Sequence, residues 1–294
     1  MPFDFNHIEK ILSWEKDPSK FLKDCVSVDT ISGLSRFVEV PYQKRLFEAI
    51  DKNQFTMCKL FRQSGKTISM LGYCLWYLMF HSNKNVVFVT RDHIMERGVW
   101  LQFNKLFESL PVEIKPKKST FSMYYSSVAT IFENESIFWV TSLSGLSSYF
   151  RGGTDDLALI VLDDYADYTE QEKEILKYEI VPRITKEKVV LISTPKGLED
   201  DFEECFGRKE FTKVKGEYKE FPSADKVKYF EDALTSFENV KPNPLRIMQE
   251  MLSIDGSSRV ECKIENADNK ICTTLYSLYR MLQDLNGDKP INEK

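Results

Sequence analysis

Short apolar runs alternate with stretches of helical spacing along most of the chain. Four runs stand out, FTMCKLF, VVFVT, LALIVLDD and VVLIST, at residues 55–61, 86–90, 157–164 and 189–194. Continuous apolar runs of this length are typical of strands that are buried on both faces of a parallel sheet. Strands that alternate with helices predict an α/β fold, with a mostly parallel central sheet flanked by helices.

The segments between these runs predict helices. Residues 38–50 place Pro41 in a first helical turn and apolar residues on one face after it. Residues 68–80 are apolar on nearly all sides, which predicts a buried helix that is too short to span a bilayer. Further helices are predicted from about residue 92 to 110 and from residue 164 to about 178.

Two other patterns bear on the domain organisation. Residues 116–145 alternate polar and apolar positions, which predicts a pair of strands with a turn near Asn134. Residues 1–35 have helical spacing, and from about residue 200 the strand signal fades into mixed polar and aromatic helices. We therefore expect a core at 33–200, a small mainly helical subdomain built from 1–32 and 201–260, and a tail of unknown role at 261–294.

Composition narrows the class of protein. The chain has 294 residues, 42% of them hydrophobic, which supports a substantial core. Its net charge of −5 argues against a whole-surface footprint for nucleic acid, so any DNA contact must be local or shared between subunits. The six cysteines form no CxxC pair, and the N-terminus has no signal-peptide pattern. A reducing cytosol is expected, with no export and no membrane anchor.

The stretch KLFRQSGKTISM, at residues 59–70, carries the first candidate chemistry. A strand, a loop ending in Gly-Lys-Thr and a following helix form an anion site, because backbone N–H groups and the helix N-terminus face a phosphate. In such a P-loop, Gly65 allows close approach of the backbone, Lys66 bridges the β- and γ-phosphates and the Thr67 hydroxyl binds Mg²⁺. The full motif has a glycine where this chain has Leu60, so the match is partial.

A second motif strengthens this interpretation. The run LALIVLDD ends in Asp163 and Asp164, which places two carboxylates at the carboxyl edge of the predicted sheet. Asp163 would then hold Mg²⁺ and Asp164 would orient the attacking water. The alternative is that both residues simply cap the following helix. Because the pair follows a strand about a hundred residues after Gly-Lys-Thr, the nucleotide interpretation is favoured.

Two further pairs lie next to these motifs. Tyr42 and Gln43 would offer an aromatic face and an amide that can read adenine, although a surface glutamine on an amphipathic helix explains them as well. Ser193 and Thr194 end the strand VVLIST, so their hydroxyls would lie beside the γ-phosphate, or in an ordinary turn. Basic residues are scattered, and none is predicted as a DNA contact.

Several stretches together resemble the ATPase domain of the large terminase subunit, the DNA-packaging motor of tailed bacteriophages, especially of the myovirus type. The matching stretches are VEVPYQKRLFEAI, FRQSGKT, FESLPVEIKP, RGGTDDLALIVLDD and VVLISTPKGLED, with DPSKFLKDC before them and MQEMLSIDGSS after them. The resemblance covers about residues 15–258. Its most specific part is Arg62 to Thr67, because terminases tolerate a missing first glycine and carry arginine and glutamine in this loop.

The resemblance implies an ATP hydrolase with a P-loop fold that uses ATP and Mg²⁺. It implies that Gln43 reads adenine beside Tyr42 and that Arg62 senses or stabilises the γ-phosphate. It also implies the remaining roles: nucleotide binding by Gln63, Ser64, Gly65, Lys66 and Thr67, a magnesium-site acid at Asp163, and coupling of hydrolysis to movement at Ser193 and Thr194. The implied partners are double-stranded DNA, a portal protein, a small terminase subunit and further copies in a ring, in the host cytoplasm and on the prohead portal.

Two features depart from the family pattern. The residue after the magnesium-site acid is usually glutamate, the catalytic base, whereas this chain has Asp164. Aspartate is shorter by one methylene, and misplacement on the order of 1 Å can cost roughly a hundredfold in rate. Asp167 and Glu170 are alternative acids. The other departure is length: 36 residues follow Ser258 (294 − 258), so we expect no nuclease activity from this chain.

The favoured function is an ATP-driven translocase of double-stranded DNA. A P-loop helicase is one alternative, although the sequence gives no second motor domain. The other alternative is a nucleotide-binding interaction module with weak turnover or none, which Asp164 permits.

Overall fold

The computed structural model describes residues 5–30, 33–61, 64–122, 128–152, 157–194, 202, 206–216, 220, 261–266 and 269–274. Its α-helices are α1 (Phe5–Glu15), α2 (Pro18–Cys25), α3 (Pro41–Lys52), α4 (Lys66–Phe80), α5 (His93–Glu108), α6 (Leu143–Arg151) and α7 (Glu170–Ile175). Short 3₁₀ and π turns form η2 (Tyr165–Asp167), η3 (Leu176–Ile180) and η4 (Val181–Arg183). None of the described helices combines the length and apolar content needed to cross a bilayer.

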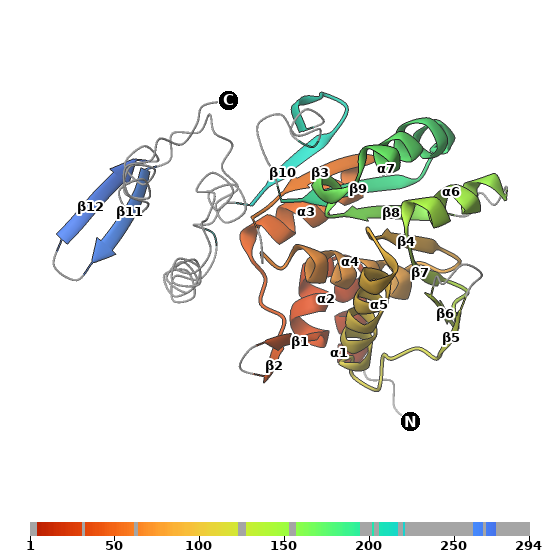
Figure 1. Cartoon of the computed structure of the whole chain (residues 1–294). Coiled ribbons are helices and arrows are strands. Elements are labelled where there is room, and N and C mark those ends of the chain that lie inside the picture. Colours follow the sequence, from red (N-terminus) through yellow and green to blue (C-terminus); the bar gives the residue numbers. More distant parts are fainter. Residues whose placement is uncertain are drawn as a thin grey trace.

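Eight strands form the central sheet (Figure 1). In spatial order they are β10 (Thr212–Lys215), β3 (Phe55–Lys59), β9 (Lys188–Ser193), β8 (Leu157–Asp163), β4 (Asn85–Val89), β7 (Ile137–Thr141), β6 (Val128–Phe132) and β5 (Lys118–Ser122). The strands from β10 to β7 are parallel to their neighbours, and β6 and β5 are antiparallel. The predicted α/β fold with a mostly parallel sheet is therefore confirmed.

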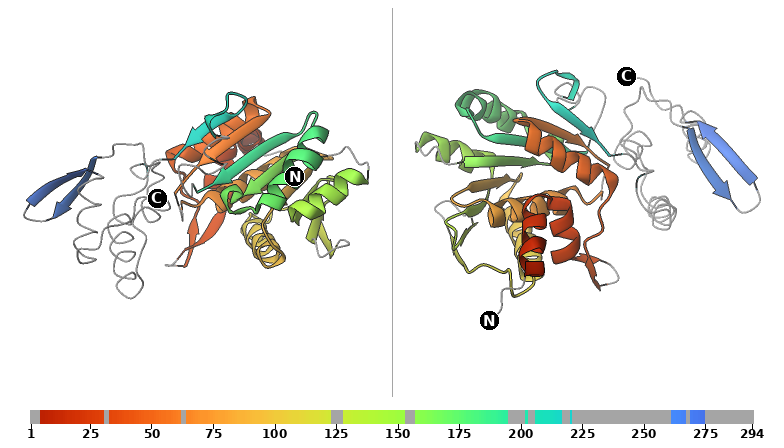
Figure 2. Two further views of the ribbon diagram at one scale, coloured as in Figure 1. Left: turned by 45° about the horizontal axis from the view of Figure 1, so that its top comes forward. Right: turned by 180° about the vertical axis from the view of Figure 1, so that it is seen from behind.

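Both faces of the sheet are covered, which explains the unbroken apolar runs. Along β8, Leu159 and Val161 belong to one buried cluster, and Ile160 and Leu162 belong to a second cluster on the other face. Figures 1 and 2 show α2, α4 and α5 on one face of the sheet and α6 and α7 on the other. A strand covered on both sides needs apolar residues at successive positions rather than at alternate ones.

The predicted helices at 38–50, 68–80 and 92–110 correspond to α3, α4 and α5. The alternating segment contains the predicted hairpin, because β6 and β7 are joined by a turn that includes Asn134. It also contains β5 and leads into α6, neither of which was predicted. The helix expected up to residue 178 is instead a succession of η2, α7 and η3.

Described parts of the two segments that were predicted to build a small helical subdomain pack against the core. Phe21 and Leu22 of α2 are fully buried in the same cluster as α4, and the Trp76 indole of α4 donates to the Trp14 carbonyl at 2.7 Å. Residues 212–215 form β10, which pairs in parallel with β3. Two small antiparallel ribbons lie outside the main sheet, β1 (Ser27–Thr30) with β2 (Gly33–Arg36) and β11 (Glu261–Asn266) with β12 (Asn269–Thr274).

Leu60, where the P-loop motif has glycine, is a core residue. It follows β3, its side chain is fully buried, and its N–H donates to the Ser193 carbonyl at 3.0 Å. Gly216 follows β10 and donates to the Lys59 carbonyl at 3.1 Å. A Cβ at Gly216 would lie 2.4 Å from Leu60 Cδ2 and 3.1 Å from the Tyr42 ring. Leu60 therefore fills the space that the absent side chain of Gly216 leaves open.

Replacing Gly216 with alanine is expected to lower the free energy of unfolding by about 1–3 kcal/mol, because the added methyl overpacks this contact. Urea unfolding followed by circular dichroism measures the change. Gly98, in α5, is the matched control, since a Cβ there would meet nothing within 4 Å. Gly98→Ala should be neutral or stabilising by up to about 1 kcal/mol. Equal stability of the two variants would contradict the packing argument.

Candidate functional site

The loop between β3 and α4 ends in a residue with left-handed backbone geometry. Gly65 has φ 75° and ψ 18° and is the N-cap of α4. L-residues with a side chain rarely adopt this conformation, so glycine suits the position. The first turn of the 15-residue helix leaves its N–H groups without intrahelical acceptors, and its dipole favours a negative charge there. Arg62 and Gln63 belong to the same loop and lie outside the described residues.

The hydroxyl of Ser64 adds a donor to this end of the helix. Ser64 is 2% exposed, and its Oγ has no hydrogen-bond partner among the described residues. A buried hydroxyl without a partner costs free energy. A phosphate oxygen at the N-terminus of α4 would satisfy it. The unpartnered Oγ, the N–H groups of the first helical turn and the Lys66 ammonium form a donor set that fits a phosphate.

Tyr42 and Gln43 support this loop from behind. The buried Tyr42 hydroxyl donates to the Ser64 carbonyl at 2.8 Å. The Gln43 amide donates to Ser69 Oγ at 2.6 Å, and Ser69 Oγ donates to the Gly65 carbonyl at 2.7 Å. Gln43 Oε1 accepts from the Val40 N–H at 2.7 Å, which satisfies a free backbone donor at the start of α3.

This network overturns the interpretation of Gln43 as a surface residue, because Gln43 is 4% exposed. In this structure both polar atoms of its amide bond within the protein, and the Tyr42 ring is fully buried. Burial also raises the pKa of the Tyr42 hydroxyl, so it remains a neutral donor. A contact between Gln43 and adenine stays a prediction.

The two predicted motifs meet at the carboxyl edge of the sheet. The Lys66 ammonium lies 3.0 Å from Asp164 Oδ1 and 3.5 Å from Thr194 Oγ1. The Thr67 hydroxyl donates to Asp163 Oδ2 at 2.8 Å. Four of the residues predicted for phosphate, magnesium and water, together with Thr194, therefore lie in direct contact.

Asp163 is buried next to a second carboxylate, and both conditions disfavour its charged form. It ends β8, is 5% exposed, and accepts the Asp164 N–H at 3.0 Å. Burial, and then the negative charge of Asp164, raise the pKa of Asp163 to about 7, whereas Lys66 and Thr67 act to lower it. An added cation beside this carboxylate would favour its charged form.

Asp163 and Thr67 also fit a magnesium ion. Mg²⁺ prefers hard oxygen ligands and is usually held in proteins by one or two carboxylates together with substrate phosphates. The Thr67 hydroxyl and the Asp163 carboxylate are adjacent oxygens on two different elements, 2.8 Å apart. They lie at the end of α4 where the phosphate donors gather.

Asp164 has left-handed backbone geometry, with φ 51° and ψ 42°. Asparagine and aspartate adopt this region more readily than most residues with a side chain. The geometry turns the chain into η2, whose Asp167 N–H donates to the Asp164 carbonyl at 2.8 Å. The acidic pair does not cap α7, because Thr169 does so, and Asp164 occupies the N-cap position of η2 without a capping bond from its side chain.

The alternative acids have other partners. Glu170 forms an ion pair with Lys173 at 3.0 Å, and its side chain is 83% exposed. Asp167 lies 3.8 Å from the guanidinium of Arg91, which follows β4. Of the three acids considered for water activation, Asp164 is the one that forms an ion pair with Lys66.

Ser193 connects the two motifs. It is 1% exposed, and its Oγ accepts the Ala166 N–H at 2.9 Å, in the turn after Asp164. Its carbonyl accepts the N–H of Leu60, just before the phosphate loop. A displacement of the η2 turn would therefore be transmitted through Ser193 to the residue that follows β3. The role of Ser193 and Thr194 in coupling stays a prediction.

The sequence interpretation missed Ser69 and Arg91. Ser69 had a signal, because it is a lone serine in an apolar run, four residues after Gly65, and such spacing puts both on one side of a helix turn. Arg91 had a weaker signal, because it follows the apolar run VVFVT at the predicted carboxyl edge of the sheet.

No protein-family model and no curated protein sequence matches the chain. Among solved structures, the ATPase domain of the large terminase of Thermus phage P74-26 is similar at 18% identity and a TM-score of 0.50, over 70% of this chain and 91% of that one. The large terminase of bacteriophage HK97 is similar at 16% identity and a TM-score of 0.57, over 95% of this chain and 60% of that one. The chain therefore has the fold of phage large terminase ATPase domains.

Proposed function

We propose that this protein is the ATPase motor component of a phage terminase and couples ATP hydrolysis to translocation of double-stranded DNA into a prohead. The observation that carries the proposal is the convergence of Lys66 and Thr67 with Asp163 and Asp164 at the N-terminus of α4. The buried, unpartnered hydroxyl of Ser64 supports it, because a phosphate would supply the missing acceptor.

In the proposed mechanism, Lys66 moves from Asp164 to the phosphates. The ion pair between them is 12% and 35% exposed on its two side chains, so both groups lose part of their hydration whether they are paired or not. A phosphate carries more negative charge than one carboxylate and draws the ammonium away. Asp164 is then free to accept a proton from the attacking water.

Asp163 and Thr67 would hold the magnesium ion. Bound Mg²⁺ supplies neutralisation of the charge that develops on the phosphate oxygens. Asp163 must be deprotonated for this purpose, and its raised pKa means that metal binding competes with a proton near neutral pH. The second carboxylate, that of Asp164, faces Lys66 rather than Thr67 in this structure.

The remaining parts of the proposal follow the resemblance to terminases. The partners would be double-stranded DNA, a portal protein, a small terminase subunit and further copies of this chain in a ring. The protein would act in the host cytoplasm and on the prohead portal. Ser193 would transmit the state of the site, because it contacts both the η2 turn and the residue before the phosphate loop.

Lys66→Ala is expected to reduce phosphate release from ATP by at least about a hundredfold, because it removes the cation that stabilises the transferred phosphate. Steady-state release of phosphate in the presence of Mg²⁺ measures the effect. Lys20→Ala is the matched control, since Lys20 is an exposed lysine of α2. Equal turnover by the Lys66 variant and the control would rule out the proposed site.

Two further measurements, of ATP binding and of duplex unwinding, separate the alternatives. Tight ATP binding without phosphate release, even with DNA and a portal present, would point to an interaction module. Unwinding of a forked duplex by the purified chain would point to a helicase.

Asp164→Asn is expected to lower turnover by about a hundredfold or more while the protein stays folded, because asparagine tolerates the same φ but cannot accept the proton. Asp167→Asn is the matched control, and its turnover should stay within severalfold of the original, since Asp167 faces Arg91. The opposite ranking of the two variants would transfer the role of base to Asp167. Single-turnover measurements exclude an effect on product release.

Asp163→Asn tests the buried carboxylate without nucleotide or metal. The pKa of Asp163 is about 7 in the folded protein and about 4 in an unfolded chain, so the folded state binds one more proton between these values. Stability from this group is therefore present below about pH 4 and is lost as the pH rises to about 7. The unfolding free energy of the variant, minus that of the original, should rise over this window. If the unfolding free energies of the variant and the original protein changed equally with pH, the raised pKa of Asp163 would be contradicted.

A further inference from the structure

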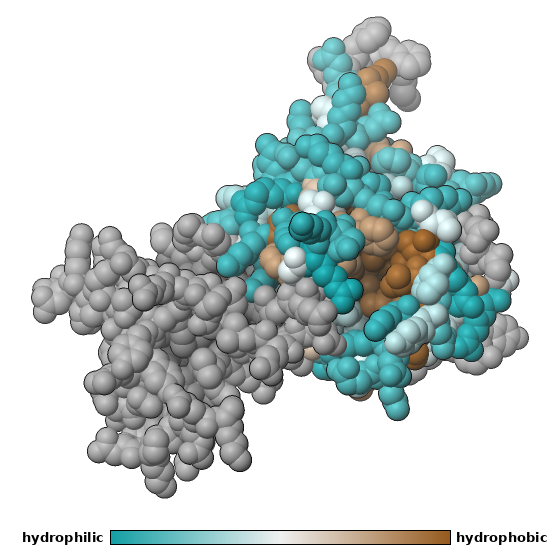
Figure 3. Space-filling view, turned by 90° about the horizontal axis from the view of Figure 1, so that it is seen from above, coloured by the Kyte–Doolittle hydropathy of each residue, from teal (hydrophilic) through white to brown (hydrophobic). Residues whose placement is uncertain are grey.

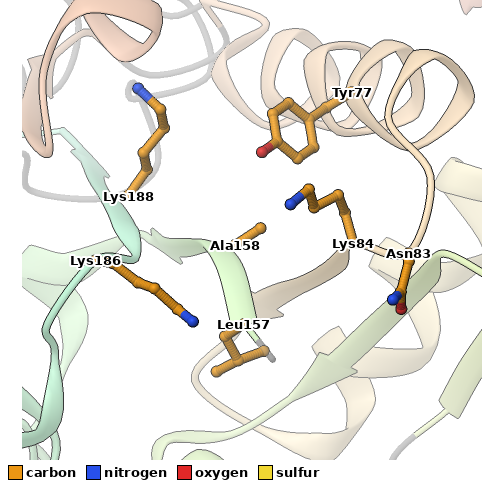
Figure 4. Close-up of a pocket in the computed structure, with 7 residues that line it drawn as sticks. All are labelled: Tyr77, Asn83, Lys84, Leu157, Ala158, Lys186 and Lys188. Carbon is orange, nitrogen blue, oxygen red and sulfur yellow. The ribbon is translucent and has the colours of Figure 1, made fainter. Parts of the chain in front are cut away.

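A cavity of about 410 Å³ lies at the edge of the sheet opposite the candidate site. It is bordered by the starts of β4, β8 and β9, whereas Asp163 and Ser193 lie at the ends of β8 and β9. Its lining includes three lysines, Lys84, Lys186 and Lys188, and Tyr77 from the last turns of α4. Figure 4 shows the polar ends of Tyr77 and Lys84 directed into the same space beside Ala158.

One of the three lysines has a structural role. The Lys188 ammonium donates to the carbonyls of Ile50 and Asp51, the latter at 2.8 Å, at the end of α3. A cation at the C-terminus of a helix satisfies free carbonyls and interacts favourably with the helix dipole. In Figure 4 its amino group points away from Lys84 and Lys186.

The other two lysines are uncommitted. Lys84 and Lys186 are exposed, and neither ammonium has a hydrogen bond or an ion pair with any other residue in the described part of the chain. The Tyr77 hydroxyl also has no hydrogen bond within those residues, and its ring stacks on His81 at 4.3 Å between centroids. Burial, and then Asp51, raise the pKa of Tyr77, so its hydroxyl keeps its proton at neutral pH.

In the described part of the chain, the acidic groups near this cavity include Asp51 and Glu187, which have partners of their own. Asp51 accepts the Tyr73 hydroxyl at 2.6 Å. Glu187 is 3% exposed, and its carboxylate accepts the N–H groups of Thr185 and Lys186 at 2.7 and 2.9 Å. The two ammonium groups and the phenol make no hydrogen bond or ion pair with these two carboxylates, and they line the cavity as candidate donors.

We propose that this cavity binds the oxyanion of a phosphate ester. A phosphate offers several acceptor oxygens, which match donors that approach from α4, from the turn before β4 and from the turn before β9. The cavity is larger than a phosphate alone, and Leu157 and Ala158 provide apolar lining that suits the sugar of an ester. The favoured source is the backbone of double-stranded DNA, a choice that rests on the proposed function, and a free phosphate compound is the other source.

The test compares the double variant Lys84→Ala/Lys186→Ala with the control Lys20→Ala/Lys44→Ala. Both remove two exposed lysines and the same charge, and the control residues lie on α2 and α3. Fluorescence anisotropy with a labelled duplex, in the absence of nucleotide, gives affinity at several salt concentrations. Calorimetry with inorganic phosphate, on protein that carries Lys66→Ala, gives the small-anion arm without the contribution of the phosphate loop.

Loss of two phosphate contacts is expected to weaken DNA binding about tenfold or more at about 0.1 M salt, and to reduce the slope of log affinity against log salt by about 1.8. Tyr77→Phe, which keeps the ring on His81, should weaken binding by a smaller factor. The control should bind DNA like the original protein. ATP turnover without DNA should be unchanged in the cavity variant, which keeps this test distinct from that of the hydrolytic site.

Unchanged DNA binding with loss of inorganic phosphate binding in the cavity variant would support the site and assign it to a free phosphate compound. The proposal is overturned if both probes bind the cavity variant and its control equally, or if the original protein binds neither probe. A change confined to self-association, measured by sedimentation, would also overturn it, because the cavity would then receive a group from a second copy of the chain.

Discussion

Asp163 and Asp164 place two carboxylates side by side at the end of a strand that is buried on both faces. Mutual repulsion and lost hydration both oppose their charged forms, and the surrounding groups offset this cost. Thr67 and the Asp164 backbone donate to the first carboxylate, and Lys66 pairs with the second. If a phosphate withdraws Lys66, the repulsion returns, and a cation beside Asp163 is then favoured. In the proposed mechanism, the arrival of the anion and the retention of the metal would thereby be linked.

Those parts of the fold that lie in the middle of the sheet were predictable from the sequence. Four central strands are buried on both faces, so successive residues in each must be apolar: β3, β4, β8 and β9. β10 was missed because it is an edge strand with the sequence TKVK, in which only Val214 is buried. Its place beside β3 depends on a pairing across about 150 residues, which no local pattern records. α6 was missed although Leu143 and Leu146 have helical spacing, because the helix has only 9 residues and its start was assigned to the alternating segment 116–145.

In the candidate site too, the residues fixed by local sequence patterns were predicted, and those that depend on packing between distant segments were not. Lys66, Thr67 and Asp163 were predicted because a loop motif and a strand end fix their backbone positions. The supporting network of Tyr42, Gln43 and Ser69 was not, since it depends on how α3 packs against the start of α4. The geometry of Asp164 was also beyond the sequence pattern, although the choice of aspartate over glutamate is consistent with its positive φ.

The contact between Leu60 and Gly216 has a consequence for how such chains diverge. A leucine at the first motif position requires a residue without a side chain after β10, and the two positions are separated by more than half of the chain. A glycine at position 60 would lift that restriction. Selection should therefore act on the two sites as a pair. A search that tests position 60 alone will interpret a larger side chain there as loss of the phosphate loop, although the change is accommodated at Gly216.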